Sequence, residues 1–230
     1  MKTIGLIGGM SWESTREYYR IINETVREKL GGLHSAKCTI YSFDFQDIAS
    51  LQERDDWETL ARLLIDAALR LEKTGAGVIL ICTNTMHKVA DDVRDALTVP
   101  LLHIADAAAE RIIHEGKHTI GLMGTRFTME EDFYKKRLYE CHGVDVLVPS
   151  KAQREKVDSI IFEELCAGVF REHSKEALIA IMNELIAAGS EGILLGCTEL
   201  PLIVHQEDVP YPVFDTTAIH ARAAVEYALS

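Results

Sequence analysis

The chain has 230 residues, of which 47% are hydrophobic and 26% charged, and its formal net charge is −12. This length and composition are typical of a globular protein with a sizeable core, in one large domain or two small ones. The acidic balance disfavours nucleic acid and anionic membrane as partners, because both are bound by clustered lysine and arginine. We find no signal peptide, no membrane-spanning run, and neither a disulfide framework nor zinc-ligand spacing among the five cysteines, so we expect a cytoplasmic protein with reduced thiols and no metal.

The first half predicts alternating strands and helices. One helix carries an i, i+3, i+4, i+7 apolar stripe from Leu60 to Leu71 and ends at Gly75. In chain order we expect a strand over 3–7, a helix from about residue 14, a strand over 38–43, a loop that carries Gln52, the helix just described, a strand over 78–82, and a short strand ending near 102.

The second half repeats this order. Thr128 and Glu131 have the spacing of a capping box and predict the start of a helix there. The other expected strands are 119–123, 144–148, the apolar run before Cys197, and 211–214. The other expected helices lie around 156–166 and before Gly189, and a final helix from Asp215 returns to the first half.

Three pairs of segments match between the halves, which favours internal duplication over a chance likeness of two βα units. Gly5 matches Gly121, Thr83 matches Cys197 and Pro100 matches Pro212, at separations of 116, 114 and 112 positions. Alternating strands and helices predict parallel sheets covered on both faces. We therefore predict an α/β fold with two similar Rossmann-like lobes, residues 1–100 plus 215–230 and residues 101–214, and an active site in the cleft between them.

Ligands of such sheets bind beyond the carboxyl ends of the strands, which draws attention to the loops at 8–11, 83–85, 124–128 and 197–199. Cys197 follows a buried strand at an expected turn into a helix, where backbone N–H groups and the helix dipole would lower the pKa of its thiol. Thr83 takes the matching place, and Asn84 and Thr85 beside it could hold a carboxylate. The alternatives are a buried cysteine in the core and a polar turn that only caps a helix.

The remaining candidates are weaker. Strand alternation turns Cys82 toward the core, and we expect Cys38 and Cys141 to be packing residues as well. The sequence has no G-x-G-x-x-G or Walker motif. Three histidines flank the candidate loops without metal-ligand spacing and are expected to make ordinary hydrogen bonds: His87, His103 and His220.

The loop sequences resemble those of the aspartate/glutamate racemase family over the whole chain. The matching segments are Gly8-Gly9-Met10-Ser11, Cys82-Thr83-Asn84-Thr85-Met86-His87 and Gly196-Cys197-Thr198-Glu199, with Asp215 and His220 near the end. The resemblance implies two α/β lobes, a small-molecule substrate that is an acidic amino acid (aspartate or glutamate), and catalysis without pyridoxal phosphate (PLP), any other cofactor or metal. Two facing cysteines of this family act as acid and base on opposite faces of the α-carbon. Relatives are often dimers, so the resemblance also implies a homodimer.

The resemblance implies roles for individual residues. Cys197 would remove the α-proton of the L-enantiomer, and Thr83 falls where the family usually has its first-lobe cysteine. The α-carboxylate would be bound by Asn84, Thr85 and Thr198. Substrate-lining positions would be Met10, Gln52, Thr125, Cys166 and Glu199, with Cys166 in a segment where relatives commonly have lysine.

Thr83 departs from the family pattern. An aliphatic hydroxyl is not a base at neutral pH without an activating partner, and the sequence shows none beside it. We therefore expect turnover of acidic amino acids to favour L-substrates, with Thr83 a weak proton donor and conversion from the D side weak in initial rates. A catalyst cannot bias the equilibrium, so reverse turnover must still exist.

Two other readings are compatible with the sequence. One is a decarboxylase of the arylmalonate type, which also keeps only the second-lobe cysteine but needs an apolar pocket where Gln52 and Asn84 are polar. The other is a protein that binds acidic amino acids without turning them over. The choice between aspartate, glutamate and another amino acid is open, because one methylene changes binding by only about 1–3 kcal/mol.

Overall fold

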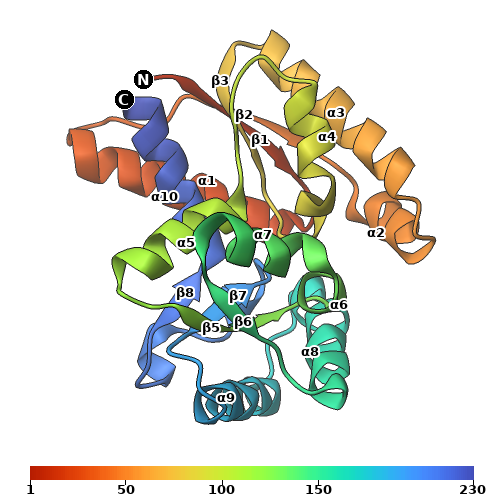
Figure 1. Ribbon diagram of the computed structural model, residues 1–230. Coiled ribbons are helices and arrows are strands. Elements are labelled where there is room, and N and C mark those ends of the chain that lie inside the picture. The colour runs from red at the N-terminus through yellow and green to blue at the C-terminus, as the bar shows by residue number, and fades with distance from the viewer. The chain divides into compact units, whose positions relative to one another are not determined.

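The computed structural model describes residues 1–230 and has an α/β architecture with two four-stranded parallel sheets (Figure 1). The chain divides into two compact units. The first contains Met1–Ile104 and His220–Ser230, and the second contains Ala105–Ile219. No helix has both the length and the apolar character needed to cross a membrane.

The first unit is built on a sheet with the strand order β2-β1-β3-β4. Leu60, Leu64 and Leu71 of α3 pack against this sheet, which confirms the predicted apolar stripe. Figure 1 shows α1 and α10 on the other side of the sheet from α3. The elements are β1 (Thr3–Gly8), α1 (Trp12–Leu30), β2 (Cys38–Ser42), α2 (Phe45–Glu53), α3 (Trp57–Lys73), β3 (Ala76–Ile81), the 3-10 helix η1 (Thr85–Val89), α4 (Ala90–Asp95), β4 (Leu101–Leu102) and the end of α10 (Thr216–Leu229).

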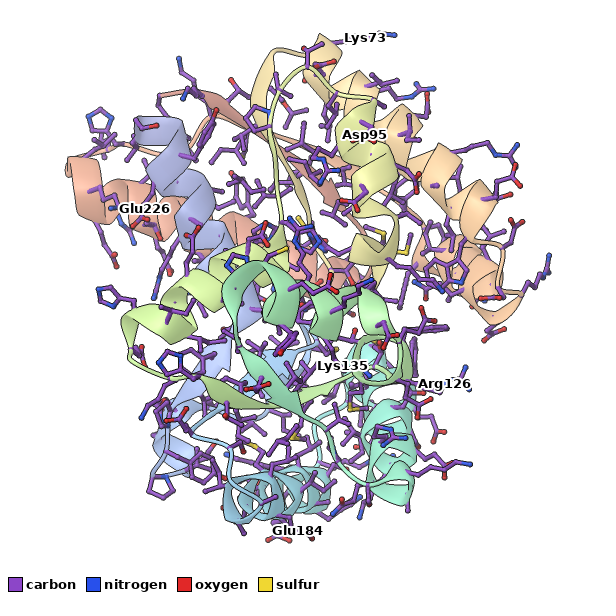
Figure 2. The ribbon with its side chains drawn as sticks, viewed as in Figure 1. Lys73, Asp95, Arg126, Lys135, Glu184 and Glu226 are labelled. Atoms are coloured by element: carbon purple, nitrogen blue, oxygen red, sulfur yellow. The ribbon has the colours of Figure 1, made fainter.

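The second unit repeats this arrangement with the order β6-β5-β7-β8. Helices α8 and α9 contribute Ile161, Leu178 and Met182 to its hydrophobic core. Figure 2 shows Lys73 on α3 and Glu184 on α9 pointing away from the sheets that these helices cover. The elements are α5 (Ile104–His114), β5 (Thr119–Gly124), α6 (Arg126–Glu130), α7 (Asp132–His142), β6 (Asp145–Leu147), α8 (Lys151–Glu163), η2 (Leu165–Ala167), α9 (Glu172–Ala187), β7 (Ile193–Gly196), η3 (Leu200–Leu202), η4 (Gln206–Asp208) and β8 (Val213–Asp215).

The strand register of the two sheets reproduces the repeat seen in the sequence. Pairings of β1 with β3 and of β3 with β4 have counterparts in the second sheet at the sequence offsets of 116, 114 and 112, which supports duplication. The matched pairs are Gly5–Ile79 with Gly121–Ile193, Ile7–Ile81 with Met123–Leu195, and Ile79–Leu101 with Ile193–Val213. Thr83 and Cys197 each stand two residues beyond a matched pair, so they occupy equivalent positions in their own sheets.

Gly5 and Gly121, which occupy equivalent positions in the two sheets, also have equivalent neighbouring side chains. A Cβ atom at Gly5 would lie 2.6 Å from an isoleucine Cδ1, and one at Gly121 would lie 2.8 Å from its counterpart. Both glycines therefore let the covering helix approach its sheet closely. The neighbours are Ile79 and Leu71 at Gly5, and Ile193 and Leu185 at Gly121.

Several local predictions were wrong. Gln52 lies within α2 and not on a loop, because Asp44 caps the helix that carries it. The N-cap of α6 is Thr125, whose hydroxyl accepts from the Thr128 amide, so Thr128 lies inside the helix and forms no capping box with Glu131. Glu131 instead has an extended backbone and precedes α7.

Candidate active site

The Thr83 loop, residues 82–85, continues from β3 at the carboxyl edge of the first sheet. Cys82 donates its backbone N–H to the Ile7 carbonyl and is fully buried, and burial raises the pKa of its thiol well above the ordinary range. It is a packing residue, as the strand alternation predicted. Thr83, Asn84 and Thr85 are also buried. The loop therefore encloses polar groups at a strand end, as a small polar ligand requires.

Within the first unit, the Thr83 hydroxyl makes no hydrogen bond. His87 contacts the main chain of this residue: its Nδ1 lies 2.8 Å from the carbonyl oxygen of Thr83. An aliphatic hydroxyl needs a contacting base to become a proton acceptor. The contact of His87 with the main chain does not supply one.

Met10 and Gln52 lie at the same edge of the first sheet. Met10 follows β1 and is buried in the hydrophobic cluster that contains Met86. The Gln52 amide contacts the Met86 sulfur, with Nε2 3.1 Å from Sδ. Because Met86 directly follows Thr85, both predicted lining residues belong to the surroundings of the Thr83 loop.

The Cys197 loop, residues 197–199, follows β7 in the second unit. The Cys197 thiol donates to Oε2 of Glu199 at 2.9 Å, and the Thr198 hydroxyl donates to the same oxygen at 2.9 Å. Cys197 is 5% exposed and Glu199 is 3% exposed. One buried carboxylate oxygen therefore accepts from both candidate functional groups of this loop, and charge-assisted bonds of this kind are stronger than neutral ones.

The predicted lowering of the Cys197 pKa was wrong. Burial raises the pKa of this thiol well above its ordinary value, and the charges of Glu199 and Cys166 raise it further. The hydrogen bond that the thiol donates to Glu199 acts in the same direction, and only a weaker backbone bond opposes it. The following helix, η3, has only three residues and provides little dipole. At neutral pH the isolated protein therefore holds Cys197 as the thiol.

Thr125 and Cys166 belong to the same edge of the second unit. Thr125 and Cys197 follow directly after Gly124 and Gly196, which pair with each other across β5 and β7. Cys166 lies in η2, is half-buried, and packs against the hydrophobic cluster that includes Cys197.

The other two cysteines differ from each other. Cys38 is half-buried in β2, as expected for a packing residue. Cys141 is exposed, so its assignment as a packing residue was wrong: it falls on the solvent face of α7, whereas Tyr134 and Leu138 fill the buried face.

Sequence reasoning missed the direct bond between Cys197 and Glu199. It placed Glu199 only among the substrate-lining residues. The available signal was the two-residue spacing after a strand end, where a tight 3-10 turn can return a carboxylate to the first side chain of the loop. His87 was recognised only as an ordinary hydrogen-bonding residue, without its partner.

Comparison with known proteins gives a consistent result. A Yersinia pestis protein assigned as an Asp/Glu racemase has a structure 56% identical in sequence, with a TM-score of 0.93 and full coverage of both chains. An aspartate racemase homologue from Pyrococcus horikoshii OT3 is 42% identical over both full chains, with a TM-score of 0.87. The broad specificity amino-acid racemase RacX of Bacillus subtilis is 25% identical over 99% of this chain and 98% of its own.

The family model described as Asp/Glu/Hydantoin racemase matches residues 7–224. The two-unit fold, the repeated strand-end loops and this match agree. The chain belongs to the Asp/Glu/Hydantoin racemase family and is an amino-acid racemase.

Proposed function

We propose that this racemase interconverts the enantiomers of aspartate and glutamate without PLP or metal. Cys197 takes the α-proton of the L-enantiomer, and Thr83 is a weak proton donor to the opposite face. The observation that carries the proposal is the buried Cys197–Glu199 pair at the duplicated strand-end position. RacX is named as a racemase of broad specificity, and other relatives are named as glutamate racemases. These names support an amino-acid substrate and include an acidic one.

The raised pKa of Cys197 requires an activating step. In this proposal the proton on Sγ moves to Oε2 of Glu199, which already accepts the hydrogen bond. The α-ammonium group of the bound amino acid favours the resulting thiolate, because a nearby positive charge stabilises an anionic group. The thiol then ionises when substrate is bound, although it stays protonated in the free protein.

The thiolate removes the α-proton: the Cα–H bond breaks, an S–H bond forms, and the electron pair remains on the substrate. Hydrogen bonds to the α-carboxylate from Asn84, from Thr85 and from the backbone N–H of Thr198, whose hydroxyl is engaged by Glu199, stabilise the developing charge. The proton that completes racemisation comes from solvent through the Thr83 hydroxyl, while the proton held by Glu199 returns to solvent. One proton leaves and one arrives, so the substrate changes only its configuration.

The Thr83 step makes the two faces unequal in a specific way. Two enantiomers have equal free energy, so kcat/KM for racemisation must be the same in both directions. The difference between the two enantiomers therefore appears in the rate at which the α-hydrogen exchanges with solvent. Cys197 can remove and return the proton of an L-substrate repeatedly, so α-hydrogen exchange of the L-enantiomer is faster than racemisation. Exchange of the D-enantiomer requires the slow step at Thr83 and is limited by it. Values of kcat and KM can still differ between the two directions.

The test is chiral chromatography of L-aspartate and L-glutamate after incubation with protein treated with a chelator and a PLP-trapping hydroxylamine. We expect the D-enantiomers to form, and Cys197→Ala to form none. Racemisation of neutral amino acids with none of the acidic pair would contradict the proposed substrate class. Carbon dioxide release from an arylmalonate would support the decarboxylase reading, and binding in calorimetry without α-hydrogen exchange would support a binding protein.

A further inference from the structure

Three histidines and a tyrosine form a buried network in the first unit. His87 of η1 lies with its ring centre 4.5 Å from that of His103 and 5.9 Å from that of His220, both edge to face. The Tyr18 hydroxyl lies 2.8 Å from Nδ1 of His220. All four side chains are buried, and the protein contains no group of side chains arranged to bind a metal ion. The hydrogen bonds of His87 and His220 show what the network connects.

The partners of His87 define its protonation state. Its Nδ1 faces the Thr83 carbonyl at 2.8 Å, and its Nε2 faces the backbone N–H of Ile104 at 3.2 Å. A carbonyl only accepts and an amide N–H only donates. Both bonds exist together only if His87 is neutral, with hydrogen on Nδ1 and a lone pair on Nε2.

His220 has the opposite assignment. Its Nε2 lies 3.0 Å from the Leu102 carbonyl and must donate, so in the neutral ring Nδ1 accepts from the Tyr18 hydroxyl. Ile104 and His220 are the residues at which the chain leaves the first unit and returns to it. The network thus ties the Thr83 loop to both of these points.

We propose that His87 is a positioning residue that fixes the main chain of Thr83 and, through Ile104, holds the loop against the segment where the chain leaves the unit. The inference rests on the proposed role of Thr83 as proton donor. His87 cannot serve as the base for the Thr83 hydroxyl, because its Nδ1 hydrogen is committed to the carbonyl. It affects the reaction through the placement of Thr83 and without contacting substrate.

Protonation would break this arrangement. A second hydrogen on His87 would sit on Nε2, facing the Ile104 N–H, so two donors would oppose each other. The titratable rings that face His87 in this unit are His103 and His220, and Tyr18 lies behind His220. We therefore expect the Thr83 step to slow on acidification.

Two substitutions separate the two bonds of His87. In His87→Asn the side-chain amide can still donate to the Thr83 carbonyl, whereas in His87→Gln the longer side chain can accept from Ile104 but loses the donor in the Nδ1 position. The matched control is His34→Asn, at an exposed histidine of the same unit. We expect racemisation and D-side exchange to fall roughly tenfold in His87→Gln and less in His87→Asn, as the loss of about one hydrogen bond predicts. L-side exchange should stay near the wild-type rate.

The pH profile separates positioning from general damage to the fold. The acid limb of racemisation should be absent from His87→Asn, which has no imidazole to protonate, and present in His34→Asn. Equal loss of L-side exchange and racemisation in the two His87 variants would overturn the proposal, because it would show a purely structural effect.

A third measurement does not depend on activity. Long-range 1H–15N spectra of the wild-type protein should show His87 with hydrogen on Nδ1, and amide exchange of residues 83–87 should accelerate in His87→Gln more than in His87→Asn. A hydrogen on Nε2, or equal amide exchange in all variants, would overturn the inference. If wild-type protein exchanges no L-substrate, the proposed function fails, while these spectra still test His87.

Discussion

The Thr83 loop and the Cys197 loop occupy equivalent positions in their sheets but surround the key side chain differently. Within its own unit the Thr83 hydroxyl has no hydrogen-bond partner, and His87 contacts the main chain of Thr83. The Cys197 thiol donates directly to a buried carboxylate oxygen. Strand register therefore places the two residues at equivalent positions, whereas the few residues that follow each of them determine its hydrogen-bond partners.

The following turns account for the difference. After Thr83 the chain forms η1. His87 lies in this helix, four residues after Thr83, and its Nδ1 contacts the Thr83 carbonyl. After Cys197 the chain forms the three-residue η3, preceded by Glu199, whose side chain reaches the thiol. Duplicated sheets can thus keep the same pairing of their central strands while the turns that follow give the two equivalent residues different partners.

The largest expected effect is the loss of Cys197. In Cys197→Ser the hydroxyl cannot ionise near neutral pH, so we expect both racemisation and α-hydrogen exchange from the L-enantiomer to fall by about 10⁴-fold or to disappear, at the upper end of what a positioned base contributes. NMR of the α-hydrogen signal in deuterated water measures both. Activity within tenfold of wild type would show that another group in the second unit is the base.

Glu199→Gln should weaken catalysis but make the thiol more acidic. It removes the proton acceptor, so we expect a loss of roughly 10²–10³-fold in L-side exchange. It also removes a negative charge that raises the Cys197 pKa, so iodoacetamide should modify Cys197 faster at a given pH than in the wild type.

Site-resolved mass spectrometry distinguishes Cys197 from the exposed Cys141, whose modification should not change in this variant. In the wild type the Cys197 rate should still be rising with pH above the ordinary thiol range, because the thiolate form appears only as pH approaches the raised pKa. Slower modification in Glu199→Gln would contradict the assigned effect of the carboxylate.

Thr83→Cys should make the two loops more alike. A thiol can act as acid and base where the hydroxyl cannot, so we expect racemisation in both directions and D-side exchange to rise by roughly 10–100-fold, below the full contribution of a tuned general base. The ratio of L-side to D-side exchange should move toward one. Thr83→Ser, which retains a hydroxyl, is the matched control and should keep the wild-type imbalance.

The smallest effect tests the shared scaffold. Gly5→Ala and Gly121→Ala each place a Cβ against an isoleucine Cδ1 and a leucine of the covering helix. Overpacking of this kind costs about 1–3 kcal/mol, so denaturant unfolding should show similar losses for both. Gly77→Ala meets only the flexible Lys2 side chain and should lose less. Clearly unequal losses at Gly5 and Gly121 would contradict equivalent packing.

The sequence predicted the features that depend on repeated local patterns. The strands, the α3 stripe and the register of Thr83 with Cys197 follow from alternation and from matched segments. The Cys197 pKa could not be predicted, because it depends on burial and on the direction in which Glu199 turns. Gln52 was misplaced because a polar sequence was read as a loop, although Asp44 caps a helix there. Thr128 was predicted as the cap from its spacing to Glu131, but Thr125 directly follows β5 and caps α6, so the helix already begins at Arg126.

The central claim is that Cys197 exchanges protons readily and Thr83 does not. The direct measurement is the initial rate of α-hydrogen exchange in deuterated water, followed by NMR for L- and D-aspartate and for L- and D-glutamate, alongside the rate of racemisation. The account predicts that exchange from the L-enantiomer exceeds racemisation, while exchange from the D-enantiomer does not. Equal exchange from both enantiomers would contradict it, because a second competent base would then have to serve the face assigned to Thr83.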